Sequence, residues 1–81
     1  MKARTRKTYP RSFVVEFDRE EDGRWIAEVP RLPGVMAYGT TKEEARRKVH
    51  AVALRTLAHD VEEGRNIAPL SRLFSYGVAR R

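Results

Sequence analysis

The chain has 81 residues, of which 41% are hydrophobic and 35% charged, and a formal net charge of +6. This length suits one small domain with one core, so the composition excludes a second domain and disorder of the whole chain. The absence of cysteine excludes disulfides and cysteine zinc sites, while the lack of a membrane-length apolar run or an apolar leader predicts a soluble cytoplasmic protein.

The N-terminal residues 1–11 carry basic side chains and no acidic ones. Residues 12–79 hold 10 basic and 11 acidic residues, so the positive charge lies in the two ends of the chain. We expect a flexible basic arm over residues 1–11 and one domain over residues 12–81. The arm either binds nucleic acid weakly and non-specifically or only keeps the chain soluble. The candidate nucleic-acid contacts are Lys2, Arg4, Arg6 and Lys7.

Alternation of apolar and polar residues predicts strands at 12–19 and 24–29. A two-residue turn between them would set Phe17 opposite Glu28 and mix charge into the apolar face. A three-residue turn that ends on a left-handed Gly23 pairs Phe17 with Ala27 instead, and we predict that turn. The apolar face then comprises Phe13, Val15, Phe17, Trp25, Ala27 and Val29, with Trp25 in the core.

A proline-rich turn at 30–34 ends the second strand, and residues 35–38 are predicted as a short third strand. Thr41 and Glu44 form a capping box that opens a helix, and Gly64 marks its end. The predicted apolar stripe of this helix comprises Ala45, Val49, Val52, Ala53, Leu57 and Val61.

Residues 70–78 are predicted as a fourth strand, either within the sheet or at an interface between subunits. The result is an α+β fold of β-β-β-α-β order, a small, mainly antiparallel sheet with one long helix on one face. The other face lacks a cover, and Tyr38 either packs on the helix start or contacts a partner. We interpret this open face as a partner-binding surface, with Val14, Glu16, Asp18, Ile26 and Glu28 as its candidate residues.

Catalytic chemistry has no support in the sequence. His50 and His59 lie nine residues apart on one helix, so they face opposite sides and cannot share a metal there. The carboxylates of the open face lie on a flat sheet that no predicted loop encloses, and the glycines form no phosphate-binding loop. We therefore expect no enzyme activity, no catalytic residue, no metal and no cofactor.

Two motifs follow one another along the chain: D-G-R-W-I-A-E-V-P-R-L-P-G at 22–34 and G-T-T-K-E-E-A at 39–45. Their order and spacing resemble the HicB family, the antitoxins of HicA–HicB type II toxin–antitoxin systems. The likeness spans about residues 12–64 of the 81. It departs at Arg31, Val35 and Tyr38, where the family usually has an acidic residue, a cysteine and a polar residue.

The resemblance implies a partial ribonuclease-H-like fold that binds and blocks a small basic RNA-cleaving toxin. Because the sequence ends at Arg81, we expect a short form without the DNA-binding domain that many of these antitoxins carry. The first hypothesis is therefore an antitoxin-like binding module whose open face covers such a toxin. The second is a stand-alone HicB-like homo-dimer or homo-tetramer with no toxin.

Overall fold

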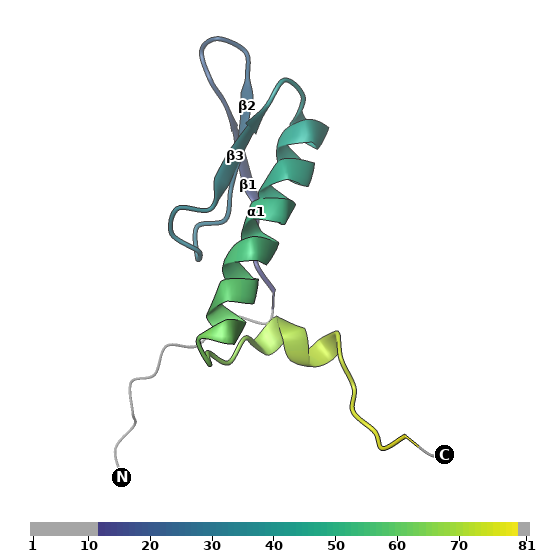
Figure 1. The fold of residues 1–81 in the computed structure, drawn as a ribbon. Coiled ribbons are helices and arrows are strands. Elements are labelled where there is room, and N and C mark those ends of the chain that lie inside the picture. Colours follow the sequence, from purple (N-terminus) through teal and green to yellow (C-terminus); the bar gives the residue numbers. More distant parts are fainter. Residues whose placement is uncertain (1–11, 80–81) are drawn as a thin grey trace.

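Three short strands and one long helix form the body of the protein, which the computed structural model describes over residues 12–79 (Figure 1). The elements are β1 (Glu16–Arg19), β2 (Trp25–Glu28), β3 (Met36–Gly39), α1 (Lys42–Glu62) and a 3-10 helix, η1 (Ala68–Arg72). The sheet is antiparallel with β2 in its centre, and α1 packs on one face. The predicted α+β class and the order of the first four elements are confirmed. The expected arm, with Lys2, Arg4, Arg6 and Lys7, lies outside the described residues.

The turn between β1 and β2 sets the register of the sheet. Glu20 N–H donates to the Arg24 carbonyl at 2.8 Å, and Gly23 N–H donates back to the Glu20 carbonyl at 2.9 Å. Gly23 has a φ of +93°, which a residue with a Cβ rarely adopts. Phe17 lies opposite Ala27, so the three-residue turn and its pairing are confirmed.

The turn from β2 to β3 keeps the same residues facing inward. Val29 N–H donates to the Val35 carbonyl at 3.0 Å, and the five intervening residues form a tight loop that buries Leu32. Because the loop has an odd number of residues and Val29 lies opposite Val35, inward-facing residues of the second strand pair with inward-facing residues of the third. In β3, Ala37 therefore faces inward opposite Ala27.

Helix α1 begins and ends at the predicted residues. The Thr41 hydroxyl accepts the Glu44 N–H at 3.0 Å, and Glu44 Oε1 accepts from Thr40 N–H at 2.6 Å, one residue before the position that a standard capping box uses. At the other end, Gly64 has a φ of +87° and its N–H donates to the Val61 carbonyl. Arg65 N–H donates to the Asp60 carbonyl, which completes a Schellman ending.

The core lies between α1 and the inner face of the sheet. Its buried residues are Ala27, Val29, Leu32, Val35, Ala45, Val49, Leu57 and Ile67. Gly39 permits the close approach of the helix, because a Cβ there would lie 2.5 Å from the Ala45 backbone nitrogen. The sequence therefore places its smallest residue where β3 and the first turn of α1 meet.

Trp25 packs against this core, as predicted, but it is only partly buried. The Arg19 guanidinium lies 5.0 Å from the centroid of the indole ring. The Lys42 ammonium lies 5.6 Å from the same ring and 4.9 Å from the Phe17 ring. These two cations form cation–π contacts with the partly buried rings at the edge of the core.

Two predictions for the C-terminal third of the chain are wrong. Val61, assigned to the buried stripe, is 45% exposed because the chain turns away just after it. Residues 70–78 form no strand: η1 occupies Ala68–Arg72, and residues 74–79 have no regular structure. Pro69 near the start of η1 favours a helical turn, and a strand without a neighbouring strand has no ladder to stabilise it. Ile67, between α1 and η1, belongs to the buried core.

Candidate protein-binding site

The face of the sheet opposite α1, the outer face, combines an acidic side and an apolar side. The register places Glu16, Glu28 and Met36 in one row and Asp18, Ile26 and Tyr38 in the next. The carboxylates of β1 thus form one border of the face, while the Met36 and Tyr38 side chains of β3 form the other, 41% and 40% exposed. All four predicted strand residues, Glu16, Asp18, Ile26 and Glu28, share this face.

Val14 precedes β1 and is 64% exposed. Burial alternates strictly from residue 12 to residue 18, so Val14 continues the outward-facing series of Glu16 and Asp18. The structure therefore places all five predicted contact residues on one side of the molecule.

Two like charges oppose each other directly on this face, between β1 and β2. Glu16 and Glu28 are Cα partners across β1 and β2, and both are exposed. Among residues 12–79, no cation forms an ion pair with either carboxylate. Opposed like charges destabilise a sheet, so this pair is a local cost that an external cation would relieve.

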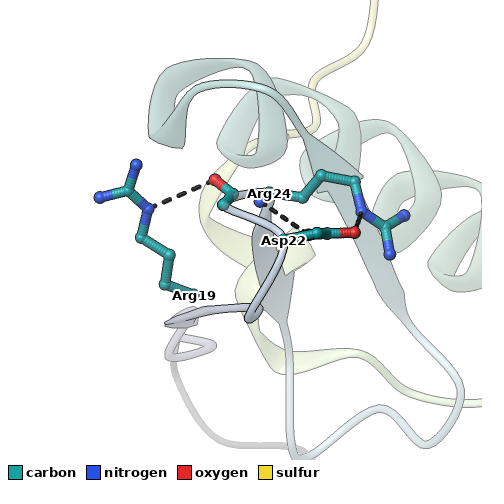
Figure 2. Close-up of polar contacts among 4 residues, drawn as sticks. Arg19, Asp22 and Arg24 are labelled. Carbon is teal, nitrogen blue, oxygen red and sulfur yellow. Dashed lines mark hydrogen bonds and ion pairs between the residues drawn. The ribbon is translucent and has the colours of Figure 1, made fainter.

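Arg19 and Arg24, the two arginines that flank the β1–β2 turn, form hydrogen bonds within that turn (Figure 2). Arg24 donates from its backbone N–H to Asp22 at 3.0 Å and from Nε to the same carboxylate at 2.8 Å. The backbone hydrogen bond is the main cause that lowers the pKa of Asp22. Arg19 extends to the opposite side of the turn, where its Nε donates to the Gly23 carbonyl at 3.3 Å.

Arg24 also orders the apolar border of the face. Its guanidinium carbon lies 4.5 Å from the centroid of the Tyr38 ring, a cation–π contact between the β1–β2 turn and β3. Tyr38 thus lies on the outer face and does not pack on the start of the helix. Met36 and Tyr38 extend the predicted surface. Counting alternate residues across the five-residue turn would have found both.

The two histidines lie on α1, away from the outer face. His50 and His59 are both exposed on α1, and residues 12–79 contain no group of three histidines, cysteines or carboxylates that could share a metal ion. Asp18 accepts a hydrogen bond from Arg19 N–H at 2.7 Å, which fixes its carboxylate against the backbone. The arrangement can present charge and apolar surface to a partner.

No protein-family model matches the chain, and neither a curated protein nor a solved structure matches it. No helix within residues 12–79 has the length and apolar character required to cross a bilayer.

Proposed function

We propose that this chain is an antitoxin-like binding module that neutralises a small basic RNA-cleaving protein through its outer face. The observation that carries the proposal is the opposed pair of Glu16 and Glu28, two exposed carboxylates in direct register without a cation from the described chain. An RNA-cleaving protein needs basic side chains to hold phosphates. Those same side chains complement this pair.

The composition of the face supports a protein partner rather than a free ion. Ile26, Met36 and Tyr38 lie beside the carboxylates and supply apolar contact area next to the charges. Interfaces commonly combine a few apolar or aromatic anchors with complementary charge that guides association. The likeness of the two sequence motifs to HicB antitoxins supports a toxin of the HicA type as the partner.

The test is inhibition of RNA cleavage by purified HicA-type toxins, with the wild-type chain and two charge-reversed variants. Replacing Glu16 and Asp18 by lysine reverses the acidic border of the outer face and is expected to abolish inhibition. Replacing Glu62 and Glu63 by lysine changes the net charge equally at the far end of α1 and is the matched control. Circular dichroism establishes that both variants remain folded.

Inhibition by the wild type and the control, but not by the outer-face variant, supports the proposal. Equal inhibition by all three removes the outer face from the mechanism. No inhibition of any toxin rejects the antitoxin function, and the stand-alone homo-oligomer then becomes the better account of the fold.

A further inference from the structure

Residues 73–79, the C-terminal segment, expose apolar side chains to water. Leu73, Phe74, Tyr76 and Val78 are 68%, 59%, 89% and 93% exposed. The segment runs away from the sheet after η1 (Figure 1). Four large apolar side chains exposed within six residues of a small protein mark a candidate site of association.

The order of residues in this segment is typical of a strand with two different sides. Phe74, Tyr76 and Val78 alternate with Ser75, Gly77 and Ala79. In an extended chain, large apolar side chains would lie on one side and small ones on the other. A strand added to the edge of a sheet that has a helix on one face only would need this arrangement. Its large side chains would face the space between the sheet and the helix.

A receiving surface for such a strand lies between the residues that directly precede β1 and follow β2 and the middle of α1. This groove is open and apolar, with Phe13, Val15 and Val29 on the sheet side and Ala53, Leu54 and Leu57 on the helix side. Leu54 is 60% exposed above it. The groove adjoins β1, which is an edge strand of the sheet because β2 pairs with it on one side only within the described residues.

We propose that the C-terminal segment of one copy of this chain adds as a strand to the β1 edge of a second copy. Phe74, Tyr76 and Val78 then fill the groove of that second copy. Backbone hydrogen bonds to β1 supply the register, and the groove takes the alternate side chains, as in other cases of strand addition. The same exchange in both directions closes a two-fold dimer.

A second copy is the favoured occupant because one chain carries both complementary surfaces and η1 directs its own segment away from its own sheet. An aromatic side chain has about 150–250 Å² of surface, so Phe74 and Tyr76 at 59% and 89% exposure leave roughly 300 Å² per copy in water. Inserting both side chains from each copy therefore removes roughly 600 Å² of segment surface from water. The groove surface and the backbone of the added strand add to this area, and stable protein interfaces begin at about 1,200 Å² in total.

The test is the molecular mass of the full chain by sedimentation equilibrium, with variants on both surfaces. Tyr76→Lys places a charge on the large side of the segment, and Leu54→Lys places one in the groove at an exposed helix position. We expect the wild type to be a dimer and each variant to dimerise about 100-fold more weakly. Ser75→Lys adds the same charge one residue away, on the small side of the strand, and is expected to dimerise like the wild type.

Mixing the two defective variants provides the sharpest readout. The Tyr76→Lys chain keeps an intact groove and the Leu54→Lys chain keeps an intact segment, so one productive contact forms and a mixed dimer is expected. Slower hydrogen exchange of the β1 amides in the wild type than in Tyr76→Lys would agree with strand addition.

Three results would overturn the proposal: a monomeric wild type, a dimer that Tyr76→Lys leaves unchanged, or two variants that do not complement each other. The dimer uses the edge and the helix side of the sheet, whereas the proposed toxin contact uses the outer face. Reversing Glu16 and Asp18 should therefore abolish toxin inhibition without dissociating the dimer, so the two proposals fail separately.

Discussion

Replacing Gly39 by alanine tests how closely the helix approaches the sheet. The added Cβ would lie 2.5 Å from the Ala45 nitrogen, 2.9 Å from the Thr41 carbonyl oxygen and 3.0 Å from the Glu44 carbonyl carbon. All three are backbone atoms of the N-cap and first turns of α1, so no side-chain rotation relieves the contact. The helix start must move away from β3.

The displacement disturbs several stabilising features together. Ordinary van der Waals contact needs about 3.5–4.0 Å, so the backbone must shift by about 1 Å. That shift loosens the packing of the fully buried Ala45 and strains the Ala45 N–H to Thr41 carbonyl bond, now 3.1 Å long. Overpacking of a rigid site costs about 1–3 kcal/mol, and close contacts with three backbone atoms place Gly39→Ala at the upper end. An 81-residue domain has only about 4–12 kcal/mol in total.

Urea denaturation followed by circular dichroism measures the effect. With a slope of about 1 kcal/mol/M for a small domain, the midpoint is expected to fall by roughly 2–3 M. Gly23→Ala is the comparator, because its Cβ meets nothing within 4 Å and only its φ of +93° is unfavourable. It should cost about 1 kcal/mol. A Gly39→Ala variant as stable as Gly23→Ala or the wild type would refute the close approach.

Two further predictions concern α1. Val49→Ala removes two methyl groups at a fully buried position and should lower the free energy of unfolding by about 2 kcal/mol, measured by thermal or urea unfolding. Val61→Ala, at a position that is 45% exposed on the same helix, should lower it by less than about 0.5 kcal/mol. Equal losses would contradict the assigned core. Hydrogen bonds from the backbone and side chain of Thr40 lower the pKa of Glu44 from its ordinary 4.5, so the folded state releases this proton more readily than the unfolded state. The resulting stabilisation is present above about pH 4.5 and is lost as the pH falls through the lowered pKa. Thermal unfolding between pH 3 and 7 should show a shallower dependence for Glu44→Gln, and an unchanged dependence would count against this link.

The positions of the turns and of the helix could be predicted because each depends on residues close in sequence. Gly23 and Gly64 have the positive φ values that their turns need. The Thr41 hydroxyl caps the helix by accepting the N–H of Glu44, three residues later. The pairing of Phe17 with Ala27 followed from the length of one turn. Such local rules need no knowledge of the rest of the molecule.

The outer face was only partly predictable. Its acidic residues follow from alternation within β1 and β2, but Met36 and Tyr38 join them only through the register of β3. The position of Arg24 between Asp22 and Tyr38 depends on the three-dimensional path of the turn, which directs its charge away from Glu16 and Glu28.

The sequence by itself determined the order of the strands and the helix, the residues that turn the chain, and the two sides of the first hairpin. Short-range backbone preferences and the alternation of apolar and polar residues are sufficient to determine these features. Only the tertiary structure decided the state of residues 70–78. Their alternating apolar pattern favours a strand, yet a strand forms only where another strand supplies its hydrogen bonds. In the single chain η1 forms instead, and the apolar side chains of the C-terminal segment stay exposed.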